Sequence, residues 1–121
     1  MTGDEFNRFC AALPHTTHVV QWGGADVWKI GGKVFAIGGW NAGETYAVTF
    51  KVSELMYEVL RDQPGCRPAP YLASRGMKWI QRWGPEGPKD AELTDLIERS
   101  YAMIRAKLPK RLRTTWEEGE G

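Results

Sequence analysis

The stretch Val27-Trp28-Lys29-Ile30-Gly31-Gly32-Lys33-Val34-Phe35-Ala36-Ile37 decides the fold of this chain. Two short apolar runs flank a Gly-Gly pair, which is typical of a β-hairpin with a two-residue turn. Such a hairpin pairs Ile30 with Lys33 and Trp28 with Phe35. Because side chains alternate between the two faces of a strand, this register predicts two sets of residues on opposite faces. One face holds Trp28, Ile30, Phe35 and Ile37, and the other holds Val27, Lys29, Val34 and Ala36.

Further strands are predicted on both sides of the hairpin. Residues 19–22 form a short apolar run that ends at Gly23-Gly24, and residues 41–44 predict a second turn. After that turn, bulky and small or basic side chains alternate over residues 46–51. Alternation of this kind indicates an antiparallel meander with one face on a core and one face open. Residues 77–83 predict another strand, for which both orientations remain open.

Three helices are predicted from caps and apolar stripes. Thr2 and Glu5 match a capping box for a helix over residues 3–13. Ser53 is the expected N-cap of a helix over residues 54–62, and Asp90 is the expected N-cap of a long helix that ends before Pro109. We expect residues 114–121 to be a disordered tail.

The order of elements predicts an α+β fold. Helix, strands, helix, strand and helix follow one another as α-β-β-β-β-α-β-α, which suits a two-layer sandwich with all helices on one face of an antiparallel sheet. We expect a single domain over residues 1–113. The open face would carry Lys29, Thr49 and Lys51, together with Lys78 and Arg82 in one of the two orientations of the strand over residues 77–83.

Composition limits the class of protein. The chain has 121 residues, of which 42% are hydrophobic, enough for one core. No run approaches the roughly 18 apolar residues of a membrane span, and the first residues do not resemble a signal peptide. Two cysteines fit reduced thiols, so we expect a cytoplasmic protein without a membrane partner. The net charge is only +1, but basic residues are concentrated in residues 61–89 and 105–113.

Four ordered motifs give the chain a family resemblance. They are Gly31-Gly32-Lys33-Val34-Phe35-Ala36, Val48-Thr49-Phe50-Lys51, Pro70-Tyr71-Leu72 with Lys78-Trp79-Ile80, and the segment 96–101 with Lys107-Leu108-Pro109. With these motifs the chain resembles the MmcQ/YjbR family of small bacterial proteins, which are often labelled DNA-binding. The resemblance implies a fold like that of the bacterial frataxin homologue and a role with nucleic acid. Family members commonly have a His between positions 71 and 78, which this chain lacks.

Catalytic and metal chemistry is not indicated by the residues. His15 and His18 flank two threonines ahead of the first strand, where polar loop residues are the better interpretation. No cysteine or carboxylate cluster completes a metal site around them, so we expect no metal and no cofactor. Cys10 lies on the apolar stripe of the first helix, and Cys66 is the more reactive thiol of the two. The positioned titratable groups that an enzyme needs are not evident.

Two functions remain after these exclusions. The first is a non-catalytic DNA- or RNA-binding module that uses an open, basic sheet face. Its phosphate contacts would come from Lys29, Lys51, Arg75, Lys78 and Arg82. The alternative is an adaptor that binds a protein or a small ligand in a groove lined by Trp22, Trp40 and Tyr71. An exposed aromatic patch without a continuous basic face would favour the adaptor.

Overall fold

A computed structural model describes residues 1–41 and 43–120 of the chain, and the predicted α+β fold is confirmed. Ala42, in the predicted turn over residues 41–44, and Gly121, at the end of the predicted tail, lie outside the described residues. The helices are α1 (Gly3–Ala12), α2 (Glu54–Leu60), the 3₁₀ turn η1 (Ala73–Arg75), α3 (Asp90–Ala106) and α4 (Lys110–Glu120). The strands are β1 (Thr16–Gln21), β2 (Ala25–Ile30), β3 (Lys33–Gly39), β4 (Ala47–Lys51), β5 (Cys66–Pro68) and β6 (Trp79–Arg82).

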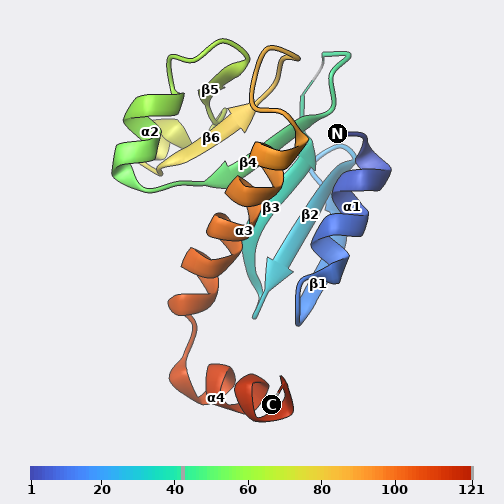
Figure 1. Cartoon of the computed structure of the whole chain (residues 1–121), viewed down its shortest axis with the longest axis vertical. Helices are drawn as coiled ribbons and strands as arrows, with labels where there is room; N and C mark the ends of the chain where they lie inside the picture. Colours follow the sequence, from blue (N-terminus) through green and yellow to red (C-terminus); the bar gives the residue numbers. More distant parts are fainter. Residues whose placement is uncertain (42, 121) are drawn as a thin grey trace.

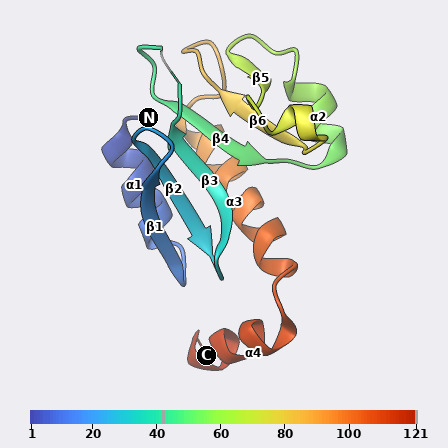
Figure 2. The same cartoon turned by 180° about the vertical axis from the view of Figure 1, so that it is seen from behind.

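The strands form one antiparallel sheet in the order β1-β2-β3-β4-β6-β5. Helices α1 and α3 cross one face of this sheet (Figure 1), and the view from behind shows strands β1 to β4 with no α-helix in front of them (Figure 2). The main core fills the space between helices and sheet. Its fully buried side chains include Phe6 of α1, Phe50 of β4 and Ile97 of α3.

The helix starts agree with the sequence in two of three cases. The Thr2 hydroxyl accepts a hydrogen bond from the Glu5 backbone N–H at 3.1 Å, and the Glu5 carboxylate accepts one from the Thr2 N–H at 2.8 Å. Ser53 caps α2 by accepting from the Met56 N–H. The prediction for Asp90 was wrong, because Lys89 is the N-cap of α3 and Asp90 is its first residue. The Asp90 carboxylate instead pairs with the amino group of Met1 at 2.9 Å.

The strand β5 and the helix α4 were not expected from the sequence. The short strand β5 forms among prolines and glycines, where its partner β6 supplies the pairing that local sequence does not predict. The segment from Thr114 onward belongs to helix α4 through residue 120, in place of the expected disordered tail. Apolar side chains Leu112 and Trp116 on α4 pack against the main core, which explains why this polar segment is helical.

The hairpin register differs from the prediction by one residue. Ile30 pairs with Lys33 as expected, but Trp28 pairs with Ala36 because the ladder shifts at Phe35. Phe35 is thus the extra residue of a β-bulge, and a bulge reverses the alternation of side chains beyond it. Ala36 therefore turns to the helix face with Phe35, and Ile37 turns to the open face. Both assignments are the opposite of those expected.

Ser100 of α3 occupies the position where the bulge leaves the ladder incomplete. Its hydroxyl donates to the Phe35 carbonyl at 2.6 Å and accepts from the Lys51 backbone N–H at 2.9 Å. Ser100 is fully buried, so no water can replace it. One side chain thereby joins the middle of α3 to both β3 and β4.

Replacing Ser100 by Ala should destabilise the fold far more than loss of an exposed hydroxyl. Ser100→Ala leaves a buried carbonyl and a part-buried N–H without their partner, at about 1–3 kcal/mol for each group. We expect the free energy of unfolding, measured by urea denaturation, to fall by at least about 2 kcal/mol. The matched control is Thr94→Ala, which removes an exposed hydroxyl from the same helix. Equal effects of the two substitutions would contradict this role of Ser100.

Candidate functional site

One row of paired residues crosses the whole open face of the sheet. The strand pairings place its members side by side in the order Val19, Val27, Ile37, Thr49, Gln81 and Arg67. The β1–β3 half of the row is apolar, and Val27 and Ile37 form a small second core with Ala25. The β4–β5 half is polar. The open face is therefore divided into an apolar part and a polar part.

Three aromatic side chains from separate loops gather over the apolar part. Trp40 follows β3, packs on the small second core, and lies 5.3 Å from the Trp22 ring and 5.7 Å from the Tyr71 ring, measured between centroids. Trp22 is 52% exposed and Tyr71 is 75% exposed. We call Trp22, Trp40 and Tyr71 the aromatic cluster. These are the three residues that the adaptor hypothesis predicted to line one groove.

The backbone at two members of the aromatic cluster is strained. Trp22 has φ of 49° and Tyr71 has φ of 68°, in the left-handed region that bulky residues rarely adopt. A residue held there costs of order 1–3 kcal/mol, and such residues concentrate at functional sites. The rings remain largely exposed despite this cost, so packing of the core does not account for their presence.

The polar part of the face is ordered by Gln81. Its side chain is fully buried, donates to the Trp40 carbonyl at 3.1 Å, and accepts from the Arg67 guanidinium at 2.7 and 2.9 Å. The Arg67 guanidinium also lies 5.5 Å from the centre of the Trp83 ring, which is 42% exposed. Gln81 therefore connects the aromatic cluster to an exposed arginine. Sequence reasoning missed Gln81 and Arg67, because nothing in the local pattern reveals that β5 pairs with β6.

The five basic residues predicted to contact phosphates do not share one face. Lys29 lies on the open face and Arg75 on the exposed turn η1. Lys78 and Arg82 lie on the helix side, because β6 presents Ile80 to the main core. The Lys78 ammonium lies 4.7 Å from the Tyr57 ring centre of α2, and buried Arg82 donates to the Tyr46 carbonyl. The expected open, basic sheet face is therefore not formed by these residues.

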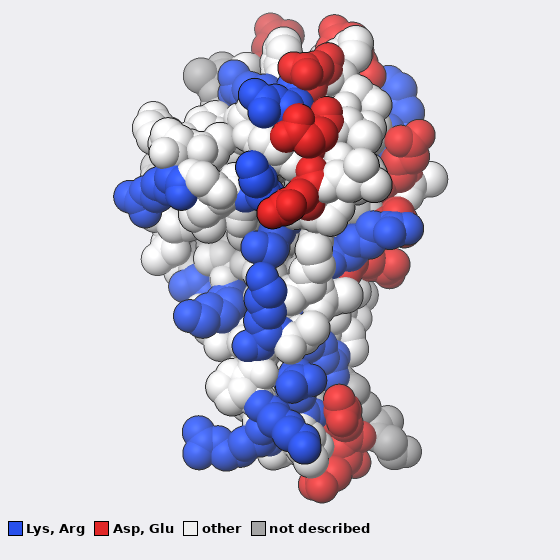
Figure 3. Space-filling model, turned by 90° about the vertical axis from the view of Figure 1, so that its left-hand side faces the viewer, with Lys and Arg blue, Asp and Glu red and all other residues white. Residues whose placement is uncertain are grey.

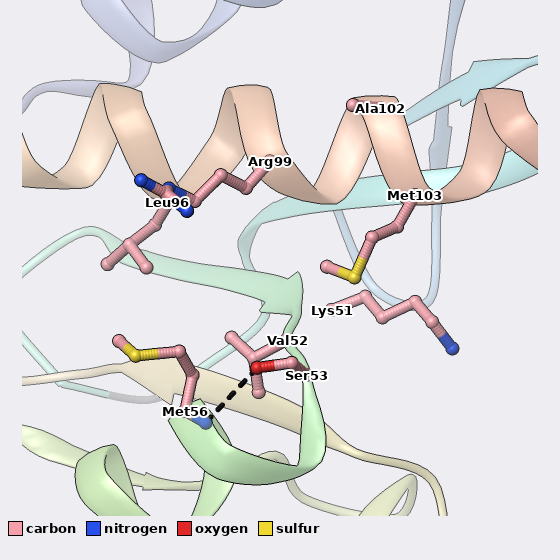
Figure 4. A pocket seen from close by; sticks show the side chains of 8 residues that line it. All are labelled: Lys51, Val52, Ser53, Met56, Leu96, Arg99, Ala102 and Met103. Carbon is pink, nitrogen blue, oxygen red and sulfur yellow. Dashed lines mark hydrogen bonds between the residues drawn. The ribbon is translucent and has the colours of Figure 1, made fainter.

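Lys51, the fifth of these residues, lies between two cavities at the end of β4. The first cavity, of about 290 Å³, is walled by α2, α3 and the segment after β4, and Leu96 and Met103 point into it from α3 (Figure 4). The second, of about 330 Å³, also receives Lys33 and Lys107. Burial and the neighbouring Lys107 together lower the pKa of Lys51.

Basic side chains also gather on the surface of the molecule. A vertical band of Lys and Arg runs down the side that carries α2 (Figure 3).

His18 lies on strand β1, not in a loop as expected, and forms a polar cluster with Asp26 and Tyr46. The Asp26 carboxylate accepts from the Tyr46 hydroxyl at 2.6 Å and is 2.9 Å from His18 Nε2. Burial would raise the pKa of Asp26, but the hydrogen bonds from Tyr46 and His18 outweigh it and hold that pKa below its usual value. Both oxygens of Asp26 are engaged, so Asp26 acts as a structural hydrogen-bond acceptor that joins β2 to His18 of β1 and to Tyr46.

The cysteines and carboxylates do not form a reactive centre in residues 1–41 and 43–120. Both cysteines are free and buried, and burial raises the pKa of the Cys66 thiol as well as that of Cys10. Cys66 is therefore a poor nucleophile, although its neighbours in sequence make it the more reactive of the two thiols. Among the described residues, His, Cys, Asp and Glu nowhere gather in a group of three or more that could hold a metal ion. Nor is any described helix both long and apolar enough to cross a membrane.

Comparisons with known proteins give one family, from a family model, and one fold, from solved structures. The YjbR family model matches residues 11–103. The Deinococcus radiodurans protein DR2400, with domain DUF419, is 20% identical and superimposes with a TM-score of 0.82 over 96% of this chain and 88% of its own. A Pseudomonas syringae protein is also 20% identical, with a TM-score of 0.67 over 86% of this chain and 99% of its own. At such identity these structures establish the fold alone. No curated protein matches the chain.

Removing the Tyr46 hydroxyl should raise the pKa of Asp26. An Asp whose folded pKa is depressed contributes stability that is present above its unfolded pKa and is lost as the pH falls through the folded pKa. Tyr46→Phe removes one of the donors, so we expect the Asp26 pKa to move up toward 3.8 and the acid-dependent loss of stability below about pH 5 to become smaller.

An NMR titration of the Asp26 carboxyl carbon measures this change directly. Tyr71→Phe, which removes the same hydroxyl from an exposed ring, is the matched control and should leave the Asp26 pKa unaltered. An unchanged Asp26 pKa in Tyr46→Phe would show that the hydrogen bond does not hold the carboxylate in its charged form.

Proposed function

This chain belongs to the YjbR family, and on that premise we propose that it is a non-catalytic binding protein whose aromatic cluster binds a segment of a partner protein. The observation that carries the proposal is the exposure of Trp22 and Tyr71 on strained backbone around half-buried Trp40. A fold that retains exposed aromatic rings at a cost in stability has a use for those rings outside its own core.

The residue types on the open face support a protein partner. Residues that contribute most to protein interfaces are chiefly Trp, Tyr and Arg, surrounded by a polar rim. The aromatic cluster supplies Trp and Tyr. Arg67 lies on the polar part of the face and is linked to the aromatic cluster by Gln81, which bonds to both Arg67 and the Trp40 carbonyl. Trp and Tyr also lose little conformational entropy on binding, because each has only two side-chain torsions.

The state of the titratable groups supports a role without catalysis. The Asp26 carboxylate is held in its charged form by donors within the fold, and both thiols are buried with raised pKa values. A general base or nucleophile needs the opposite properties, namely a free acceptor or an accessible thiolate.

Nucleic-acid binding is the second candidate, supported by the band of Lys and Arg on the side that carries α2 (Figure 3). A band of cations suits a phosphate backbone and needs no sequence recognition, although Asp and Glu lie beside the upper half of this band (Figure 3). The nucleic-acid interface would then lie on the side of the molecule that carries α2, and not on the open face of the sheet. Lys29 and Arg75 are then less favoured as contacts, since Lys29 lies on the open face and Arg75 on η1.

Substituting Trp22 and Tyr71 by Asn tests the protein-binding proposal. Asn tolerates left-handed backbone, so relief of strain offsets the lost ring contacts, and we expect the free energy of unfolding to change by less than about 1 kcal/mol. Random peptides displayed on phage should be enriched on the wild-type chain. The same sequences should lose at least about tenfold in affinity for Trp22→Asn and for Tyr71→Asn.

Leu55→Asn is the matched control, because Leu55 is 74% exposed on α2, outside the aromatic cluster. Peptides that bind wild type and the Asn variants of Trp22 and Tyr71 equally would contradict the proposal, as would the absence of any enriched peptide. In parallel, a labelled 20-nucleotide oligo-dT is titrated at low and high salt. Salt-sensitive binding that both aromatic variants retain would instead favour the nucleic-acid function.

A further inference from the structure

The cavity beside Lys51 that also contains Lys33 and Lys107 lies at the other end of β3 from the aromatic cluster. Strand β3 begins at Lys33, in the wall of this cavity, and Trp40 follows its last residue. The cavity has a volume of about 330 Å³, within the usual size of a small-molecule site. It is built from the start of β3, the end of β4, the start of β6 and the end of α3. We call it the lysine cavity.

The charge of the lysine cavity is uncompensated. Its lining includes three lysines and no aspartate or glutamate. In the part of the chain that the structure describes, none of the three lysines forms an ion pair. Burial lowers the pKa of Lys51, and the positive charge of nearby Lys107 lowers it further. Like charges brought together at a partly buried place are costly unless an anion joins them.

A second observation in the same wall also calls for a hydrogen-bond acceptor. Trp79 lines the lysine cavity and is only 4% exposed. Its indole Nε1–H is buried and has no hydrogen-bond partner within the described residues. Unsatisfied buried donors are rare in native folds, and each has a cost that a bound acceptor or ordered water removes.

The remaining walls are apolar. Val34, Ile104 and Leu108 line the lysine cavity, and the neighbouring cavity on the other side of Lys51 is lined by Met56, Leu96 and Met103 (Figure 4). A free inorganic anion would satisfy the lysines but leave these apolar walls in contact with water. A ligand with an anionic head and an apolar body satisfies both.

We propose that the lysine cavity binds a small amphipathic anion, whose carboxylate or phosphate lies among Lys33, Lys51 and Lys107 and whose apolar group packs on Val34, Ile104 and Leu108. This function is separate from the proposed protein contact, because the two sites lie at opposite ends of β3 and share no residue. Loss of one is expected to leave the other intact.

Titrations of the full chain with decanoate, decyl phosphate and decanamide, followed by NMR chemical shifts, test this site. All three probes carry the same apolar chain and are used below their micelle concentrations. Decanoate or decyl phosphate should bind and change the chemical shifts of the backbone amides around Lys51 and Lys107. The probe that binds with the higher affinity identifies the preferred head group. Decanamide, which has no charge, should bind at least about tenfold more weakly.

Charge-removing variants decide whether the lysines hold the head group. Lys51→Met and Lys107→Met keep the apolar stem, and each should weaken binding by at least about tenfold. Both variants should fold, because each removes a repulsive neighbour. Lys107 is exposed and so remains informative if Lys51→Met proves unstable. Lys29→Met on β2 is the matched control and should change the affinity less than about twofold.

Three results would overturn the proposal. The first is equal binding of decanamide and the stronger of the two anionic probes. The second is unchanged binding by both lysine variants. The third is that neither decanoate nor decyl phosphate binds. Binding of the 20-nucleotide oligo-dT at these lysines with no binding of decanoate or decyl phosphate would also overturn it, and would assign the lysines to a polyanion.

Discussion

The hydrogen bonds of Ser100 at the Phe35 bulge determine how helix α3 meets the sheet. A bulge leaves backbone groups without ladder partners, and buried backbone groups need partners. Ser100 provides them from the middle of α3, with bonds to the Phe35 carbonyl and the Lys51 N–H. Because these bonds fix the position of α3 along the strands, they also set where the end of α3, with Lys107, meets the end of β4, with Lys51.

The bulge also decides the character of the open face. Because it adds one residue to β3, Ile37 turns away from the helices and joins Val27 and Ala25 in a second, small core. Trp40 packs on that core, and the exposed rings of Trp22 and Tyr71 pack on Trp40. A regular strand would have directed Ile37 into the main core and placed the smaller Ala36 on the open face. The aromatic surface of this protein is thus a consequence of one extra residue in a hairpin.

Charge and aromatic surface are separated in space. The aromatic cluster lies on the open face, whereas Lys78 and Arg82 are held on the helix side by Tyr57 and by the Tyr46 carbonyl. Lys51 faces a cavity that it shares with Lys107 instead of projecting from the sheet. This separation favours two independent binding sites, one aromatic and one basic, over a single basic binding surface. It also explains why an almost neutral chain can present both an exposed apolar patch and a concentrated positive one.

Local sequence was sufficient for most of the helices and strands and for the class of the fold. The capping box at Thr2, the glycines of the hairpin turn and the apolar stripe of α3 act over a few residues, so their patterns are visible in the chain itself. The bulge at Phe35, the orientation of β6, the strand β5 and the meeting of Lys51 with Lys107 could not be read in this way. Each depends on residues far apart in sequence; Ser100 and Phe35, for example, are 65 positions apart. Periodicity in the sequence shows which side chains alternate along one element. It does not show which group will bond to a buried backbone atom, or which two charges will lie close together. Those contacts form only when distant elements pack together.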